Sequence, residues 1–363
     1  MTDAATLTDW IRLSSIPGVG SETQRKLLSA FGMPDRVFSA SHSALRAVIG
    51  QKAATLVLAS TPSALVIDQT LNWTASPNHA IVTLADEEYP RAFLDIPDPP
   101  VLLYVMGRLE LLNRPALAIV GSRSPTPQGL LNAQRFAAAF AEAGLVISSG
   151  LALGVDAAAH RGALSVGGDT LAFIGTGCDR IYPARNKELA YTISEQGALV
   201  SEFPLGTPAA AFNFPRRNRL ISGISKGVLV VEAAVDSGSL ITARLACEQG
   251  KDVFAIPGSI HSPQARGCHQ LIRQGAKLVE TAQDVLQELS WDPSTPRAVA
   301  AAASPLVLPD LLEYLGFDPC SLEDLSQRSG MPVADLGARL LSLEMDNLVA
   351  ALPGGFYQRI PVS

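Results

Sequence analysis

Six short β-rich runs, separated by stretches of helical pattern, constrain the fold of this 363-residue chain more than any other feature. Each run holds four or five mostly apolar residues, and most end in Gly, Ser or an ionisable residue. Strands that alternate with helices in this way form a parallel sheet with helices on both faces. We therefore predict an α/β core. Its predicted strands are residues 117–120, 145–148, 170–174, 198–201, 228–231 and 253–256.

Two smaller units flank the predicted sheet. Residues 8–72 have the pattern of short helices, so we predict an all-α N-terminal domain over 1–75. The Pro-rich segment 84–105 has an extended pattern and leads into a middle domain over 80–290. Residues 291–305 have the composition of a linker. After it, three helical stretches and a hairpin centred on Gly354 and Gly355 predict a winged helix over 306–363.

A glycine-rich turn, residues 16–20, lies between the first two helical patterns and resembles a helix-hairpin-helix. In such hairpins the backbone N–H groups at a helix start hold a DNA phosphate without reading its sequence. The alternative is that Pro17 and Gly18 only turn the chain between packed helices. The sequence supports the two interpretations about equally.

The charge of the chain is unevenly distributed. The net charge of −6 would argue against a nucleic-acid binder, because proteins that bind phosphates usually carry a basic surface. However, residues 106–290 contain 17 basic and 15 acidic side chains, whereas residues 306–363 contain 3 and 8. A polyanion is therefore expected to bind at a local patch in the middle domain.

Several classes of protein are not supported by the sequence. No apolar run approaches the roughly 20 residues that span a bilayer, and no charged leader precedes an apolar segment, so we expect no membrane association and a cytoplasmic location. The cysteines are scattered, which favours buried free thiols over disulfides or zinc. Neither a dinucleotide-binding nor a P-loop glycine pattern is present, and we expect no cofactor or metal.

Four predicted strands are followed by loops suited to an anion. Glycines and hydroxyl residues before a helix expose backbone N–H groups, and the positive end of the helix dipole favours negative charge. The carboxyl ends of parallel strands meet at one edge of the sheet, where ligands bind in open α/β folds. The candidate phosphate-binding residues in these loops are Gly121, Ser122, Arg123, Ser149, Gly150, Gly175, Gly177, Ser237, Gly238, Ser239 and Thr242.

An Asp–His pair and a tyrosine near these loops each have two competing interpretations. Asp156 and His160 are four residues apart on a predicted helix, so they form either an acid-base pair or a helix cap and a buried hydrogen bond; capping preferences favour the structural role. Tyr182 either stacks on a base of single-stranded nucleic acid or anchors the core beside Pro183. For Tyr182 the core role is the stronger expectation.

The segment from Phe214 to Gly223 contains three arginines and no carboxylate. An Arg guanidinium binds two phosphate oxygens at once, so Arg216, Arg217 and Arg219 together suit a polyanion. We expect Arg217 to form one wall of a pocket beside Arg123. Asn218 and Arg219 are expected to precede a helix and to be partly structural.

These motifs, in this order, resemble the DNA-processing protein A (DprA/Smf) family over roughly residues 80–280. The resemblance is carried by Gly121-Ser122-Arg123; Ser149-Gly150 with Gly154, Asp156 and His160; Tyr182-Pro183 with Asn186; Phe214-Pro215 with Arg217-Asn218-Arg219; Glu232 with Ser237-Gly238-Ser239 and Thr242-Ala243; and Pro257-Gly258 with Gly267-Cys268. The flanking units match the extended form of the family, with a sterile-alpha-motif or helix-hairpin-helix domain before a Rossmann-like core and a winged helix after it.

The resemblance implies a non-catalytic protein that binds and shields single-stranded DNA and helps to load the RecA recombinase in natural transformation. It also implies a homodimer through the Rossmann-like domain, for which exposed apolar residues over 260–278 are the expected contact. Arg123 is implied to be a phosphate ligand. The family's basic contact after Tyr-Pro is implied to be Arg185, next to Asn186, with Lys187 in reserve.

An enzyme is the alternative function. The lysine-decarboxylase-like phosphoribohydrolases, a related Rossmann-like family, carry a catalytic Glu at the helix start that corresponds to Gly238-Ser239. Here Thr242 occupies that position and cannot act as a carboxylate base. The predicted winged helix is acidic near its second and third helices, so we expect it to contact protein rather than DNA.

Overall fold

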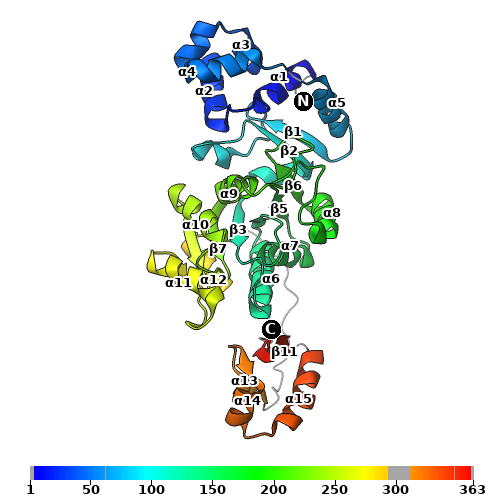
Figure 1. Cartoon of the computed structure of the whole chain (residues 1–363), viewed down its shortest axis with the longest axis vertical. Coiled ribbons are helices and arrows are strands. Elements are labelled where there is room, and N and C mark those ends of the chain that lie inside the picture. The colour runs from blue at the N-terminus through cyan, green and yellow to red at the C-terminus, as the bar shows by residue number, and fades with distance from the viewer. Residues whose placement is uncertain (1–3, 62, 293–310, 347, 361–363) are drawn as a thin grey trace.

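The computed structural model of the protein describes residues 4–61, 63–292, 311–346 and 348–360 (Figure 1). The predicted linker, residues 291–305, lies outside these ranges apart from its first two residues. A helical unit comes first, followed by a large sheet with helices and then by a small unit of helices and strands. None of the described helices is both long and apolar enough to cross a membrane.

The first unit consists of five helices. The glycine-rich turn between the first two helices is anchored by the buried side chains of Ile16 and Val19. Within this turn Gly18 has a φ of +80°, a conformation that favours glycine. Leu13 and Leu27 pack into the same small core. The helices are α1 (Ala4–Ser14), α2 (Ser21–Phe31), α3 (Pro34–Ser39), α4 (His42–Ala59) and α5 (Ala64–Thr74).

The large sheet has nine strands in the order β1-β2-β6-β5-β4-β3-β7-β8-β9. All pairs from β6 to β9 are parallel, whereas β1 pairs with β2 and β2 with β6 in antiparallel fashion. The strands are β1 (His79–Thr83), β2 (Leu102–Gly107), β3 (Ala116–Val120), β4 (Val146–Ser149), β5 (Thr170–Phe173), β6 (Ala198–Ser201), β7 (Ser225–Val230), β8 (Asp252–Ala255) and β9 (Lys277–Leu278).

The six predicted strands are present as β3 to β8, with ends shifted by at most three residues. Strands β1, β2 and β9 were not predicted. Residues 84–105 were expected to form an extended lead-in, but the last part of that segment forms β2 and extends the sheet beyond β6. The parallel α/β prediction is thus confirmed, with an antiparallel edge added.

Helices cover both faces of this sheet. They are α6 (Pro127–Glu142), α7 (Val155–Ser165), α8 (Lys187–Gln196), α9 (Asn213–Ile224), α10 (Ser239–Glu248), α11 (Arg266–Arg273) and α12 (Ala282–Glu288). Four 3₁₀ turns lie in the connections between these elements: η1 (Arg91–Asp95) between β1 and β2, η2 (Leu109–Asn113) between β2 and β3, η3 (Ala184–Asn186) before α8 and η4 (Pro263–Ala265) before α11.

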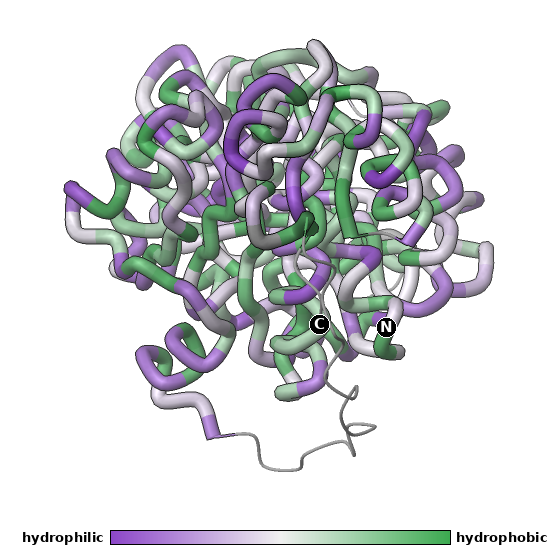
Figure 2. The backbone as a smooth tube through the Cα atoms, turned by 90° about the horizontal axis from the view of Figure 1, so that it is seen from below, coloured by the Kyte–Doolittle hydropathy of each residue, from purple (hydrophilic) through white to green (hydrophobic). Residues whose placement is uncertain are grey.

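Alternation along β3 assigns helices to the two faces. Ala118 and Val120 pack with η1, α9, α10 and α11, whereas Leu117 and Ile119 pack with α6, α7 and α12. This follows from the two-residue repeat of a strand, which sends successive side chains to opposite faces. In Figure 2, apolar segments run through the interior and hydrophilic ones are more frequent at the periphery.

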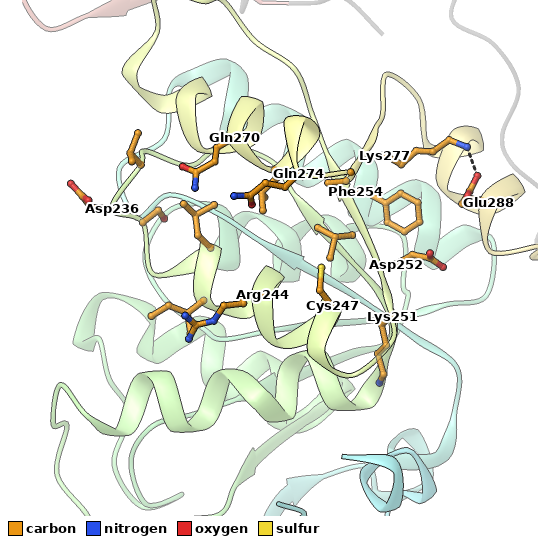
Figure 3. A pocket seen from close by; sticks show the side chains of 18 residues that line it. Asp236, Arg244, Cys247, Lys251, Asp252, Phe254, Gln270, Gln274, Lys277 and Glu288 are labelled. Atoms are coloured by element: carbon orange, nitrogen blue, oxygen red, sulfur yellow. Dashed lines mark hydrogen bonds and ion pairs between the residues drawn. The ribbon is translucent and has the colours of Figure 1, made fainter. Parts of the chain in front are cut away.

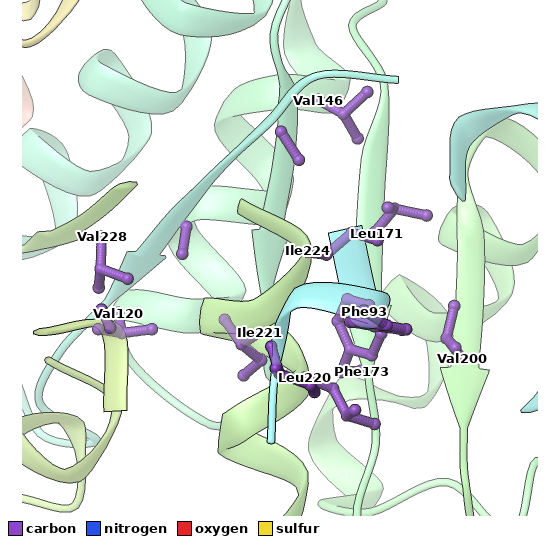
Figure 4. Packing of buried hydrophobic residues seen from close by; sticks show 14 of the residues in the cluster. Phe93, Val120, Val146, Leu171, Phe173, Val200, Leu220, Ile221, Ile224 and Val228 are labelled. Carbon is purple, nitrogen blue, oxygen red and sulfur yellow. The ribbon is translucent and has the colours of Figure 1, made fainter. Parts of the chain in front are cut away.

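One buried cluster joins η1 and α9 to the sheet (Figure 4). The rings of Phe93 and Phe173 meet edge to face with centroids 6.0 Å apart, and Leu220 and Ile221 of α9 belong to the same cluster. This packing fixes the position of α9 over the strand ends, and α9 carries the arginine-rich segment.

The C-terminal unit is a winged helix. Its elements are α13 (Leu311–Leu315), β10 (Cys320–Ser321), α14 (Leu322–Ser329), α15 (Val333–Met345), β11 (Val349–Leu352) and β12 (Phe356–Arg359), and its strands pair in the order β10-β12-β11. Cys178, Cys268 and Cys320 are buried free thiols, but Cys247 is exposed on α10. The expectation that all four thiols are buried was therefore wrong.

Candidate nucleic-acid interface

An open cavity of about 790 Å³ lies at the carboxyl ends of the central strands. β3 has β4 on one side and β7 on the other, and the helices that follow β3 and β7 pack on opposite faces of the sheet. Loops that diverge in this way leave a crevice between them. The predicted residues that line the cavity are Gly121, Ser122, Arg123, Phe214, Arg217, Asn218, Ser237, Gly238, Ser239 and Thr242.

The loop after β3 is held close to β7. Ser122 donates its backbone N–H to the Glu232 carbonyl over 2.7 Å, and its hydroxyl accepts a hydrogen bond from the Ser124 N–H. A Cβ on Gly121 would lie 2.8 Å from the Glu232 oxygen, so only glycine fits there. Arg123 is exposed, with its guanidinium carbon 5.6 Å from the centre of the Phe214 ring. It therefore presents a cation at the rim, beside an aromatic face.

The arginine-rich segment lies inside α9, because this helix begins at Asn213 rather than after Arg219. Successive helical residues turn by about 100°, so Arg217 and Arg219 point in nearly opposite directions, whereas Arg216 and Arg219 share a face. The segment is therefore divided between two environments. Only Arg217 of the three lines the cavity.

Arg219 and Arg216 both form ion pairs with Glu202, the residue after β6. The Arg219 side chain is 6% exposed and also pairs with Asp98 over 2.9 Å. Arg216 lies 3.1 Å from the same Glu202 oxygen. Both arginines are thus paired with carboxylates, and whether either of them also binds phosphate stays a prediction.

Arg217 forms the floor of the cavity. It is 4% exposed, and Nη1 donates to the Phe173 carbonyl over 2.9 Å, while Nε has no partner among the described residues. Burial lowers the Arg217 pKa to about 10, with nearby Asp156 raising it and Arg123 lowering it. Arg217 thus remains a cation at neutral pH and retains a free donor.

The loop after β4 supports Arg217. Asp156 accepts hydrogen bonds from the backbone N–H groups of Gly150 and Ala152, over 3.2 and 3.3 Å. Burial raises the pKa of this carboxyl despite the opposing effect of Arg217. His160 is fully buried, bonds to the Thr170 hydroxyl at 2.7 Å, and has its pKa lowered by burial to about 3. Asp156 and His160 therefore both form buried hydrogen bonds, but the expected helix cap is absent, because Asp156 bonds to N–H groups that precede α7.

The N-terminus of α10 forms the opposite wall. Ser237 and Ser239 share a hydrogen bond of 2.7 Å between their hydroxyls, and the space above Gly238 is open. Asn218 of α9 reaches the Gly238 carbonyl at 3.5 Å. A helix N-terminus with small residues favours a negative group, since its N–H groups point outward. Arg123, Arg217 and this wall face one cavity.

The remaining predicted residues do not line it. The hydroxyl of Ser149 donates to the Ile119 carbonyl, and the buried amide of Asn186 donates to Leu151 and Ala152, so these two hold loops in place. Gly175 lies beneath the Phe214 ring, and Gly177 lies against the loop at Pro204. Gly150 is in contact with Arg217. Arg185 and Lys187 are exposed outside the cavity, and whether they contact DNA stays a prediction.

Tyr182, for which a core role was favoured, and Gln264 are among the lining residues that were not predicted as site residues. Tyr182 is half exposed and packs on Phe214 with ring centres 5.7 Å apart, so the expected core role was wrong. The neighbouring Pro183 gave no means of distinguishing a core role from a surface one. Gln264 enters from η4 and donates to the Ser124 carbonyl, while its own carbonyl is buried and unpartnered among the described residues. No motif marks Gln264 in the sequence.

The carboxylate that follows β7 is turned away from the cavity. Glu232 accepts hydrogen bonds from the N–H and hydroxyl of Thr126, which in turn caps α6. Burial raises the pKa of Glu232. Thr242 is buried at the cavity wall. Within the described ranges no cluster of side chains suits a metal ion. Two other carboxylates, Asp156 and Asp236, do line the cavity, so its suitability for an anion depends on Arg123, Arg217 and the α10 N-terminus.

Comparison with known proteins matches both units. Residues 80–290 fit the family described as DNA recombination-mediator protein A, and residues 295–355 fit the DprA winged helix domain. Protein Smf of Escherichia coli (strain K12) is 44% identical over 299 residues, which cover 80% of each chain. DNA processing protein DprA of Streptococcus pneumoniae is 48% identical over 209 residues, covering 58% of this chain and 74% of the relative.

Two solved structures are similar in fold. The X-ray structure of DprA from S. pneumoniae matches with a TM-score of 0.70 and 38% identity, over 77% of this chain and 98% of that one. A structure that describes the single-stranded DNA binding mode of DNA processing protein A from Helicobacter pylori matches with a TM-score of 0.53 and 33% identity, over 58% and 95%. The chain therefore belongs to the DprA/Smf family of DNA recombination-mediator proteins, in its form with a winged helix.

Proposed function

We propose that this protein binds single-stranded DNA through the cavity between β3, α9 and α10. The observation that carries the proposal is the convergence of Arg123, Arg217 and the α10 N-terminus on one cavity whose rim bears Tyr182 and Phe214. Cations and N–H groups suit the backbone, and exposed rings suit unstacked bases. The H. pylori relative, which is described as binding single-stranded DNA, supports the same assignment.

A titration of a fluorescein-labelled 30-nucleotide oligonucleotide tests the proposal. Each neutralised phosphate releases counterions, so affinity should fall steeply with salt, and Arg123→Ala should reduce the slope by about one unit. Arg328→Ala, which removes an exposed arginine of the winged helix, is the matched control and should leave the slope unchanged. Micromolar or weaker binding at low salt, indifferent to Arg123→Ala, would contradict the assignment.

We also propose that the protein is non-catalytic. The phosphoribohydrolase alternative needs its carboxylate base at the start of α10, but Thr242 stands at the expected position and Glu232 is engaged by Thr126. The test is release of free base from nucleoside monophosphates, measured by chromatography. Release by the wild type that Glu232→Gln abolishes would establish the enzyme instead.

The finer cellular role is proposed from family membership. The protein is a cytoplasmic factor that shields incoming DNA and helps to load RecA during natural transformation and recombination. RecA's DNA-dependent ATPase should start sooner on oligonucleotide covered by single-strand-binding protein when this protein is added. An unchanged lag, with single-strand affinity intact, would refute the loading role while leaving DNA binding in place.

A homodimer through the Rossmann-like domain completes the proposal. The edge strand β9 leaves both of its residues exposed, and Ile260 and Leu278 are 75% and 45% exposed. A groove of about 750 Å³ lies alongside, between α10 and α11, with the Lys277–Glu288 ion pair at one end (Figure 3). Light scattering should give twice the chain mass, and Ile260→Asp with Leu278→Asp should halve it. Dimers that persist in this double variant would place the contact elsewhere.

A further inference from the structure

Helix α15 of the winged helix exposes apolar side chains on the face turned away from its own core. Leu336, Leu340 and Leu343 are buried in that core. Leu341 and Met345 are instead 60% and 78% exposed. Large apolar side chains gathered on one exposed face are typical of a binding surface, whereas single exposed ones need no explanation.

The spacing of these residues is that of a helix-packing seam. Ala334, Ala338, Leu341 and Met345 follow one another at intervals of four, three and four residues, and all four are exposed. At 3.6 residues per turn they lie within about 60° of each other around the helix. A stripe with this spacing packs against a second helix. The two alanines leave room for a close approach, and the two larger residues provide contacts.

The charges beside the stripe define what can bind there. Asp335 and Glu344 are exposed on its two sides, and Asp346 follows the last turn. Arg339 is exposed one turn after Asp335, so three carboxylates and one cation flank the stripe. DNA is disfavoured, because carboxylates at this position would repel phosphates. A second copy of α15 packed antiparallel is disfavoured too. In that arrangement each flank faces the same flank of the other helix, so Asp335 would approach the partner's Asp346, and like charges facing each other are destabilising.

We propose that this α15 surface, formed by Ala334, Ala338, Leu341 and Met345, binds an amphipathic helix of another protein whose flanks carry Lys or Arg. The helix would place its apolar face on the stripe and its cations against Asp335 and Glu344. This surface is separate from the single-strand cavity and goes beyond the proposed DNA binding. Binding of this kind combines apolar anchors with flanking ion pairs.

Full-length protein and a model peptide test the proposal. The probe is a fluorescein-labelled helical peptide of Leu, Ala and Lys with apolar residues at 3-4 spacing, compared with the same peptide carrying Glu for Lys. Leu341→Ser combined with Met345→Ser removes the two large anchors but keeps every charge. Leu65→Ser on α5, where Leu65 is 65% exposed, is the matched control. All substituted side chains are exposed, so the melting temperature should not change.

The expected result is anisotropy-detected binding of the cationic peptide, at least tenfold weaker in the double variant and within twofold in Leu65→Ser. The anionic peptide should bind at least tenfold more weakly than the cationic one. Equal affinity of the wild type and the double variant, or equal affinity for the two peptides, would overturn the proposal. Two other outcomes, if specific to the double variant, would also overturn it. A loss of double-stranded DNA binding would identify DNA as the occupant of the surface, and a smaller mass by light scattering would identify a second copy of the chain.

Discussion

Substituting Gly150 by alanine moves a charge in the cavity without removing one. The added Cβ would lie 1.6 Å from Arg217 Nη1 and 2.5 Å from its Cζ, whereas ordinary contact needs at least 3.4 Å. The Gly150 backbone does not have a positive φ, so the conflict is purely steric; the closest atoms belong to Arg217, and Asp156 Oδ2 would lie 2.7 Å away. The guanidinium must shift by roughly 2 Å, which breaks its 2.9 Å hydrogen bond to the Phe173 carbonyl.

The expected magnitudes follow from this displacement. A lost hydrogen bond to a charged group costs about 1.5–3 kcal/mol, so Gly150→Ala should lower the free energy of unfolding by about 2–3 kcal/mol. Loss of one such contact to a phosphate should weaken oligonucleotide binding roughly 10- to 100-fold, since about 1.4 kcal/mol corresponds to a factor of ten. Urea denaturation and fluorescence anisotropy measure the two quantities.

Gly129→Ala is the matched control. Its Cβ would lie 2.4 Å from the Glu232 carboxyl carbon, a comparable conflict on a side chain that does not line the cavity. It should lower stability by a similar amount and leave single-strand affinity within about twofold. If Gly150→Ala is destabilised but binds DNA as the wild type does, Arg217 is not a DNA contact. If both variants lose affinity equally, the loss reflects destabilisation rather than the displaced charge.

Three further predictions concern stability and domain roles. The His160 pKa is about 3 in the folded protein against an ordinary 6.5, so between these pH values the unfolded state binds one proton more than the folded state. The free energy of unfolding should therefore fall by up to about 1.4 kcal/mol for each unit by which the pH is lowered through this range. His160→Gln should flatten this part of the pH profile measured by urea denaturation. Glu202→Gln removes the carboxylate that Arg216 and buried Arg219 share, so it should lower the free energy of unfolding, measured by urea denaturation, by about 3–5 kcal/mol. A decrease of under about 1 kcal/mol would refute a stabilising role for these ion pairs. Deletion of residues 301–363 should leave single-strand affinity within a few fold by anisotropy, and a large loss would contradict a protein-contact role for the winged helix.

The central strands and the cavity loops could be predicted from sequence because their signals are local. The apolar runs that became β3 to β8 and the Gly-Ser-Arg triplet are each read within a few residues. The division of the arginine-rich segment could not be predicted in this way. It depends on where α9 begins and on Glu202 and Asp98, which are distant in sequence from Arg219. Strand β2 was missed because one of its two partners, β6, comes far later in the chain.

The antiparallel edge of the sheet has a consequence for synthesis on the ribosome. β2 ends at Gly107, and its partner β6 is complete only at Ser201, about 90 residues later. At 5–20 residues per second, the β1–β2 hairpin therefore waits roughly 5–20 s for its neighbour. An isolated hairpin is marginally stable, and β2 is mostly buried in the finished sheet. The nascent chain thus exposes an apolar, unpaired strand edge during this interval, which makes it a site for chaperone binding or for mispairing between neighbouring nascent chains.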